Sequence, residues 1–170
     1  YGGTYRLFQQ LFAPYGVDAG YVDTSDISAV EGAIRPTTRA LFIETPTNPM
    51  MKISDLHALA DLASRKQLLS IVDNTFMSPY LQRPLLLGCD LVVHSATKYL
   101  GGHNDLVAGL LVARDPELGK KLAFIQNATG SVLGPQDCWL LMRGMKTLAV
   151  RPDRQQENAQ RNVQIGKAHV

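Results

Sequence analysis

Residues 68–105 read LLSIVDNTFMSPYLQRPLLLGCDLVVHSATKYLGGHND and contain two apolar runs that each lead into polar side chains. The runs LLSIVD (68–73) and DLVVHS (90–95) have the near-continuous apolar character of strands that are covered on both faces. The first run ends at the carboxylate of Asp73, and the second leads into Ser-Ala-Thr-Lys at 95–98. This stretch therefore predicts two buried strands with polar, chemically useful side chains at their ends.

The segments on either side of this stretch alternate between helix and strand patterns. Apolar residues recur at helical spacing in 4–16, which ends on Gly16, and in 54–67, which has Ser54 at its start. Such alternation predicts an α/β fold, with a mainly parallel sheet and helices on both faces. The other expected elements are a short strand at 17–23, a helix at 25–34 capped by Ser25 or Asp26, strands at 39–45 and 106–113, and helix from 116 onward.

The composition excludes several classes of protein. The chain of 170 residues is 45% hydrophobic and 19% charged, as expected of one globular domain that buries roughly 70% of its unfolded surface. Its net charge of +2 is too small to predict binding to nucleic acid or to an anionic membrane. No apolar run approaches the roughly 18 residues of a membrane-spanning helix. Two cysteines, Cys89 and Cys138, do not make a disulfide framework, so a cytoplasmic location is expected.

The carboxyl ends of the expected strands carry the candidate site residues. In a mainly parallel sheet the ligand site lies at this edge, so Glu44, Asp73 and the run 94–98 are expected to face one crevice. Lys98 follows an apolar strand and is expected to be poorly solvated, which would leave its amine neutral. A neutral amine, hydroxyls that can hold a phosphate and a fixed carboxylate together meet the needs of pyridoxal phosphate.

Each of these residues also has a simpler structural interpretation. Asp73 could cap a turn, Lys98 could be solvated in a loop, and Ser95 and Thr97 could cap a helical turn. Asn48, which lies between two prolines, could be a turn residue only. Each interpretation is plausible for one residue, but the shared placement at strand ends favours a cofactor site.

The histidines and cysteines carry no comparable signal. The histidines, at 57, 94, 103 and 169, show no metal-ligand spacing, so no metal site is predicted. His94 is expected to be a hydrogen-bonded core residue. Cys89 and Cys138 are expected to be small buried hydrophobes rather than nucleophiles.

Four stretches of the chain resemble the trans-sulfuration family of pyridoxal-phosphate enzymes. They are YGGTYRLF (1–8), ETPTNP (44–49), the run 72–105 and LLMRGMKTL (140–148), and the resemblance extends to about residue 151. The family includes cystathionine lyases, cystathionine γ-synthase and methionine γ-lyase. The resemblance implies the aspartate-aminotransferase-like fold (fold type I), pyridoxal 5'-phosphate as cofactor and a small amino-acid thioether as substrate. It also implies a homotetramer, built as a dimer of dimers.

The resemblance assigns roles to individual residues. Lys98 would hold the cofactor covalently and act in catalysis, and Asp73 would pair with its pyridine nitrogen. Ser95 and Thr97 would bind the phosphate, and Asn48 would hydrogen-bond the phenolic oxygen.

Tyr1 and its neighbours bear on the activity that the resemblance implies. Tyr1 would stack on the cofactor ring and move protons in catalysis. Methionine γ-lyases carry a cysteine where this chain has Gly3, which argues against that activity. Phrases such as NTFMSPY and QNATGSVLGPQD look most like bacterial cystathionine β-lyases, so the leading hypothesis is cleavage of L-cystathionine to homocysteine, pyruvate and ammonia. The alternatives are a cystathionine γ-synthase, a γ-lyase or a homoserine-ester sulfhydrylase of the same family, or a non-catalytic truncated remnant.

The resemblance also divides the chain. Residues 1–151 are expected to form part of the pyridoxal-phosphate-binding large domain, and 152–170 a divergent helical tail that begins the link to an absent C-terminal domain. Pro152 falls where the family continues a long helix, and an interior proline costs ~3 kcal/mol or more, so a break or a drifted sequence is expected there. The family's upstream phosphate loop and downstream substrate arginine fall outside the chain, which alone is expected to be inactive.

Overall fold

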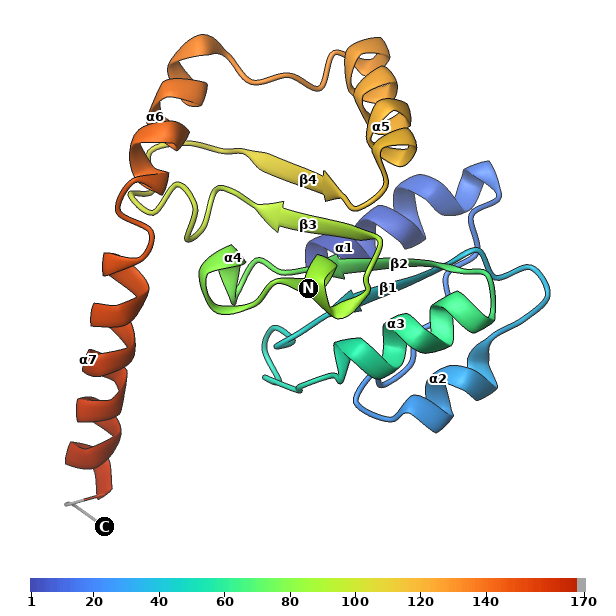
Figure 1. The fold of residues 1–170 in the computed structure, drawn as a ribbon, viewed down its shortest axis with the longest axis horizontal. Helices are drawn as coiled ribbons and strands as arrows, with labels where there is room; N and C mark the ends of the chain where they lie inside the picture. Colours follow the sequence, from blue (N-terminus) through green and yellow to red (C-terminus); the bar gives the residue numbers. More distant parts are fainter. Residues whose placement is uncertain (168–170) are drawn as a thin grey trace.

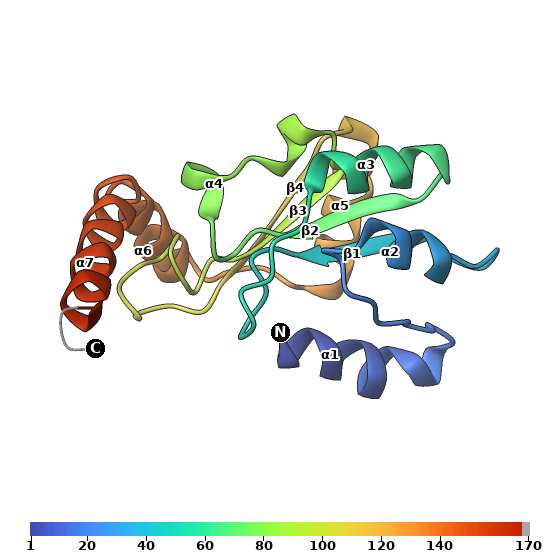
Figure 2. The same ribbon diagram turned by 90° about the horizontal axis from the view of Figure 1, so that it is seen from below.

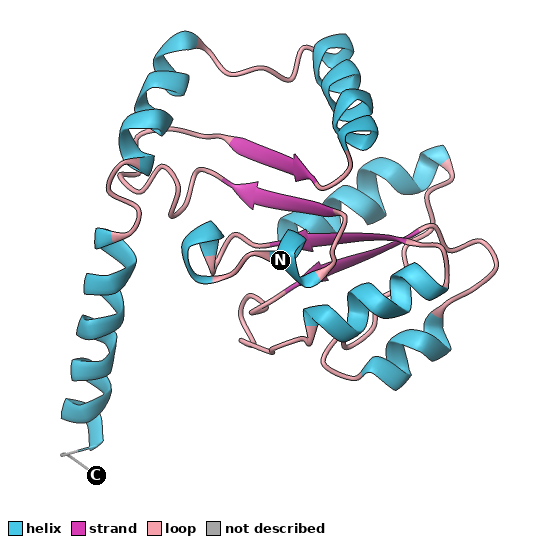
Figure 3. Cartoon of the chain, viewed as in Figure 1, coloured by secondary structure: helices cyan, strands magenta, loops and turns pink. Residues whose placement is uncertain are grey.

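A four-stranded sheet in the order β1-β2-β3-β4 forms the centre of the molecule (Figure 1). The structure is a computed structural model that describes residues 1–167. Strands β1, β2 and β3 are parallel, and β4 runs antiparallel to β3. The predicted mainly parallel sheet is thus confirmed, and Figure 3 shows how helices and loops surround it. The strand bounds are Ala40–Glu44 (β1), Leu69–Asp73 (β2), Leu91–Ser95 (β3) and Gly109–Ala113 (β4).

The N-terminal helical segment covers one face of the sheet. Figure 2 shows α1 on one side of the strands and α3 on the other. The ring of Phe8 packs edge-on against Phe42 of β1, with 5.8 Å between the ring centroids. The segment ends at Gly16, whose φ of 82° is a left-handed conformation that glycine adopts without steric cost. The predicted helix over 4–16 is therefore present, as α1 (Gly2–Arg6), the π-helical turn η1 (Leu7–Phe12) and the 3-10 turn η2 (Ala13–Tyr15).

Two helices, α2 (Ile27–Ala33) and α3 (Leu56–Arg65), cover the opposite face. Because side chains alternate along a strand, Ile43 faces these helices while its neighbour Phe42 faces the N-terminal segment. The helices thus meet the prediction of cover on both faces. The buried cluster beneath them consists of Val30, Ile43, Leu56, Leu59, Ala60, Leu62, Val72 and Cys89.

Both of these helices begin at an aspartate cap. The carboxylates of Asp26 and Asp55 each accept a hydrogen bond of 3.0 Å from the backbone N–H three residues ahead. Asp26, and not Ser25, is therefore the cap of α2. Ser54 precedes the cap of α3 and is buried, with its hydroxyl 2.7 Å from that of Thr24.

The strand predicted at 17–23 is wrong, because these residues have no strand partner within the described part of the chain. Their aspartates instead form ion pairs at the surface. The carboxylate of Asp18 lies 2.9 Å from the guanidinium of Arg35, and Asp23 binds Lys52. The apolar residues of this segment had suggested a strand, but an extended segment becomes one only where a neighbouring strand can pair with its backbone.

The remaining helices lie between β2 and β3 or after β4. They are α4 (Ser78–Leu81), the 3-10 turn η3 (Pro84–Leu87), α5 (Pro116–Thr129), α6 (Pro135–Met145) and α7 (Val150–Lys167). A second buried cluster, Ala96, Leu100, Leu106, Ala108 and Leu141, joins the loop after β3 to α6. None of the helices in residues 1–167 is both long enough and apolar enough to cross a membrane.

Helix α7 explains how the chain accommodates Pro152. The helical path is interrupted between α6 and α7, and Pro152 lies in the first turn of α7. A proline is tolerated there because its missing N–H would have no partner within the helix. Figure 1 shows α7 running away from the sheet. The tail predicted at 152–170 is helical as far as 167, and residues 168–170 lie outside the described residues.

Candidate active site

The strand register brings the predicted site residues to one edge of the sheet. Glu44 is the register partner of Asp73, and Asp73 is in turn the partner of Val93. Ser95, the last residue of β3, pairs with Gly109 at the start of the antiparallel strand β4. The carboxyl ends of the three parallel strands therefore lie side by side, where ligands of α/β sheets bind.

A hydroxyl joins the ends of β2 and β3. Oδ1 of Asp73 accepts hydrogen bonds from the backbone N–H of Thr75 (3.0 Å) and from its hydroxyl (2.6 Å). The same hydroxyl oxygen accepts the backbone N–H of Ser95 at 2.8 Å. Thr75 thus fixes the Asp73 carboxylate relative to the Ser95 loop. The turn interpretation of Asp73 is confirmed, and its role in binding a cofactor stays a prediction. The sequence analysis missed Thr75, although an Asp-x-Thr turn at a strand end was a usable signal.

The loop after β3 presents Lys98 to solvent. The backbone N–H of Lys98 donates to the carbonyl of Ser95 at 3.1 Å, which makes 95–98 a tight turn. The Lys98 side chain is exposed, so the expectation of poor solvation is wrong for this structure. Thr97 binds Ala108 on both sides: its hydroxyl donates to the Ala108 carbonyl (3.2 Å) and accepts the Ala108 N–H (2.9 Å). The Thr97 hydroxyl therefore has an acceptor lone pair left, but its proton is already used.

Asn48 is attached to the end of β1 through Glu44, and Tyr1 lies beside the same carboxylate. The backbone N–H of Asn48 donates to Oε1 of Glu44 at 2.9 Å, and the backbone nitrogen of Tyr1 lies 2.5 Å from Oε2. Tyr1 is 61% exposed, and its ring lies over Gly3, where a Cβ would be 2.4 Å from the ring. Both residues thus lie at the open edge, next to the strand that neighbours Asp73.

His94 is buried beside this edge without a full set of hydrogen bonds. It is 5% exposed, and within residues 1–167 its Nδ1 has no partner. Burial lowers the pKa of His94, and the nearby charge of Asp73 opposes this only in part. The expectation of a core position is confirmed, whereas the expectation that its hydrogen bonds are satisfied is wrong.

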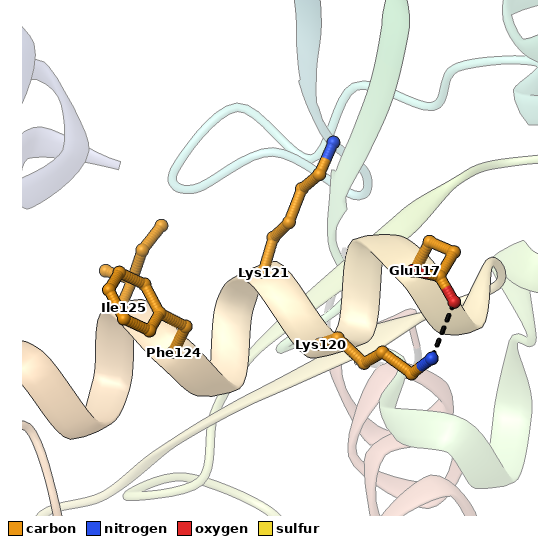
Figure 4. A pocket seen from close by; sticks show the side chains of 5 residues that line it. All are labelled: Glu117, Lys120, Lys121, Phe124 and Ile125. Carbon is orange, nitrogen blue, oxygen red and sulfur yellow. Dashed lines mark hydrogen bonds and ion pairs between the residues drawn. The ribbon is translucent and has the colours of Figure 1, made fainter.

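The surface depression in Figure 4 does not belong to this site. It is lined by residues of α5 alone: Glu117, Lys120, Lys121, Phe124 and Ile125. Lys120 pairs with Glu117 at 2.7 Å, and Figure 4 shows Lys121 pointing elsewhere. Helix α5 follows the C-terminal end of β4, which lies at the opposite edge of the sheet because β4 is antiparallel.

The polar groups at the candidate site fit pyridoxal phosphate. Within the part of the chain that the structure describes, three of them form no hydrogen bond: Oδ2 of Asp73, Oγ of Ser95 and Nζ of Lys98. A free carboxylate oxygen suits a protonated pyridine nitrogen, a free hydroxyl suits a phosphate oxygen, and an accessible amine suits an aldehyde. The donor set therefore matches the chemical groups of this cofactor.

Comparison with known proteins agrees with this fit. The sequence model of the family "Cys/Met metabolism PLP-dependent enzyme" matches residues 1–169. The chain is 56% identical over 161 residues to a cystathionine gamma-lyase of Bacillus subtilis, covering 95% of this chain and 42% of that protein. It is 47% identical over 169 residues to the cystathionine beta-lyase MetC of the same organism, covering 99% and 43% respectively.

A solved structure gives the same result for the fold. The crystal structure of cystathionine gamma-lyase from Lactobacillus plantarum complexed with L-serine superposes with a TM-score of 0.87 at 56% identity. The superposition covers 88% of this chain and 39% of that one. The chain thus spans about two-fifths of the length of the relatives it matches. With its fold, its strand-edge polar groups and a family match along nearly its whole length, the chain belongs to the pyridoxal-phosphate-dependent enzymes of cysteine and methionine metabolism.

Proposed function

We propose that this chain forms the lysine-bearing part of the active site of a carbon–sulfur lyase that acts on L-cystathionine. One observation carries the proposal. A carboxylate oxygen of Asp73 that forms no hydrogen bond within residues 1–167 and the exposed amine of Lys98 lie at the same edge of the sheet. Relatives that share this region are cystathionine lyases and synthases.

The residues at the edge would divide the work of holding the cofactor. Lys98 would attach to it covalently, and Asp73 would face the pyridine nitrogen. The hydroxyl of Ser95 would donate to the phosphate group, and that of Thr97 would do so after turning its proton away from the Ala108 carbonyl. Asn48 would approach the phenolic oxygen. When bound, pyridoxal phosphate supplies an electron sink for the carbanion formed at the substrate Cα.

The chain's own groups would then move the protons. Lys98 Nζ, when free of the cofactor, would take the proton from Cα of the substrate. As the bond between Cβ and sulfur breaks, Tyr1 or Lys98 would return a proton to that sulfur, which leaves as homocysteine. Addition of water to the remaining three-carbon unit gives pyruvate and ammonia. Asp73 acts throughout by keeping its charge next to the ring nitrogen, where positive charge must persist.

γ-Elimination is a second candidate, because a gamma-lyase and a gamma-synthase relative are each 56% identical whereas the beta-lyase MetC is 47% identical. It needs a further proton abstraction at Cβ before sulfur leaves, so Lys98 would act twice. The site is expected to tell the two apart only through walls that lie outside this chain.

We extend the proposal to the protein as a whole on the family relationship. The expected division is a partial large domain, 1–151, followed by a linking tail, 152–170. A cytoplasmic homotetramer, built as a dimer of dimers, is the expected assembly.

Product analysis of the full-length protein with L-cystathionine tests the proposal. Pyruvate with homocysteine supports β-elimination, whereas 2-oxobutyrate with cysteine assigns γ-elimination. Net formation of cystathionine from an acylated homoserine and cysteine would move the protein to the synthases. An absence of any turnover, with no cofactor bound to Lys98, would favour the non-catalytic remnant.

A further inference from the structure

The guanidinium of Arg151, in the first turn of α7, is attached to the loop that carries Lys98. Nη1 donates to the carbonyl of Tyr99 at 2.8 Å, and Nη2 donates to the carbonyl of Gly144 at 2.9 Å. Nε donates to the hydroxyl of Thr147 at 3.0 Å. The group therefore joins three points: the residue after Lys98, the end of α6 and the connection to α7.

Glycines make room for this attachment. A Cβ at Gly102, whose φ is +77°, would lie 2.2 Å from Cζ of Arg151. A Cβ at Gly144 would lie 2.1 Å from the carbonyl oxygen of Gly101. The Lys98 loop is thus pressed directly against the α6–α7 junction, with no side chain between the two backbones. Burial lowers the pKa of Arg151.

The same turn of α7 also reaches the segment that follows Asp73. Both carboxylate oxygens of Asp153 accept the hydroxyl of Tyr80, at 3.0 and 2.9 Å. Tyr80 belongs to α4, and Asn74 connects this helix to the end of β2. The side-chain amide of Asn74 donates to the carbonyls of Ser78 (3.1 Å) and Gln82 (2.8 Å). The hydrogen bond to Asp153 raises the pKa of Tyr80.

We propose that Arg151 and Asp153 are positioning residues, which hold the Lys98 loop and the Asp73 segment in one fixed relation from a single turn of helix. The inference rests on the proposed roles of Lys98 and Asp73. Neither Arg151 nor Asp153 touches the reacting atoms. Their effect is to keep the amine and the carboxylate at the separation that the cofactor requires, and a misplacement of about 1 Å can cost roughly 10²-fold in rate.

The test compares Arg151→Met with Arg154→Met in the full-length protein. Arg154 is the matched control, because it is exposed on the same helix and, among the described residues, its only ion pair is with Glu157, at 3.0 Å. Hydrogen–deuterium exchange is measured after pyridoxal phosphate has been removed. We expect Arg151→Met to speed exchange of amides 98–102 while those of β2 are unchanged, and Arg154→Met to change neither. In the loaded enzyme, Arg151→Met should lower kcat about 10- to 100-fold with KM within roughly twofold.

A second pair of variants tests the same inference if Arg151→Met fails to fold. Asp153→Asn leaves Arg151 intact and removes the charge next to Tyr80, so the pKa of Tyr80 should fall toward its ordinary value in an ultraviolet titration. Exchange in 73–82 should rise, and Tyr80→Phe should reproduce that rise without adding to it. The inference is overturned if Arg151→Met leaves loop exchange as in Arg154→Met, or if exchange rises equally throughout the sheet.

The outcome is separable from the proposed function. Borohydride reduction followed by peptide mapping reports whether the cofactor is attached to Lys98. A positive label with unchanged loop exchange contradicts the positioning role alone. A missing label in the wild-type protein contradicts the role of Lys98, and with it the functional meaning of the attachment.

Discussion

An aspartate accepts a hydrogen bond from a hydroxyl at each end of the β2–β3 pair, and the two clusters differ in which groups remain unpaired. The hydroxyl belongs to Ser70 of β2 at Asp90, and to Thr75, two residues further on, at Asp73. At the amino ends, Oδ2 of Asp90 accepts the N–H (3.0 Å) and the hydroxyl (2.7 Å) of Ser70, and Oδ1 binds Arg114. At the carboxyl ends, Oδ1 of Asp73 accepts the N–H and hydroxyl of Thr75. No cation occupies the position at Asp73 that corresponds to Arg114 at Asp90, within residues 1–167.

The difference separates a structural cluster from a site. Burial disfavours the charge of Asp90, but the bonds from Ser70 and the guanidinium of Arg114 outweigh it, so the pKa of Asp90 is lowered. Both carboxylate oxygens of Asp90 therefore have partners among the described residues. At the other end, one carboxylate oxygen, one hydroxyl and one amine have no partner among residues 1–167 and are left for a ligand. A polar cluster at a strand end thus indicates a binding site only when some of its hydrogen-bonding groups have no partner within the protein.

Replacing Lys98 by Ala should have the largest effect. Loss of covalent attachment and of the proton acceptor should lower turnover by at least about 10²–10⁴-fold. The yellow lysine-bound form of the cofactor should disappear from the absorbance spectrum of the full-length protein. Lys120→Ala, on α5, is the control and should behave as wild type. An unaltered spectrum in the Lys98 variant would show that the amine is elsewhere.

Exchanging Asp for Asn at the two ends should give opposite results. Asp73→Asn should lower kcat by about 10²–10³-fold, more than it changes KM, because the carboxylate acts on charge that develops during reaction. Asp90→Asn should instead lower the free energy of unfolding by about 1–3 kcal/mol, as expected for bonds to a charged group, with kcat little changed. Steady-state kinetics and urea denaturation of both variants measure the two effects. If Asp73→Asn lowered stability without lowering kcat, Asp73 would have a structural role like that of Asp90.

His94 should make the stability of the folded protein sensitive to acid. Its folded-state pKa lies below the ordinary value of 6.5, so the neutral form is preferred in the folded protein and protonation favours unfolding. The stability linked to His94 is complete above the unfolded pKa of about 6.5 and is lost as the pH falls through the lower folded value. Denaturation midpoints measured across this range should fall less steeply in His94→Gln than in wild type. Parallel slopes would contradict the assignment.

The smallest expected effect is on the reactivity of Cys89, which lies next to Asp90 at the amino end of β3. Burial, and then the charge of Asp90, raise the pKa of its thiol to about 11, against a smaller opposing influence of Arg114. Cys89 is fully buried and Cys138 only partly, so a thiol reagent near neutral pH should modify Cys138 first. Mass spectrometry of the native protein distinguishes the two cysteines. Asp90→Asn should leave Cys89 slow, because burial is the larger cause.

Local pattern was sufficient for most of the architecture. The near-continuous apolar runs at 68–73 and 90–95 predicted buried strands, and the helical spacing at 54–67 predicted a helix. Each of these elements is present. The segment 17–23 failed because strand formation depends on a partner that is remote in sequence. Aspartate caps fell within one residue of the expected positions, where Ser and Asp are near equal in capping strength.

The sequence by itself determined which residues stand at the carboxyl ends of the strands and, through resemblance, the family and its cofactor. Only the tertiary structure decided that Thr75 joins Asp73 to the Ser95 loop, that Nδ1 of His94 is left unpartnered, and that Lys98 is exposed. The hydrogen bond from Arg151 to Tyr99, 52 positions away, likewise could not be predicted from local sequence. Composition and periodicity specify which face of an element is buried. Which hydrogen-bonding groups are satisfied depends on the distance and direction of partners that the chain brings together only when it folds.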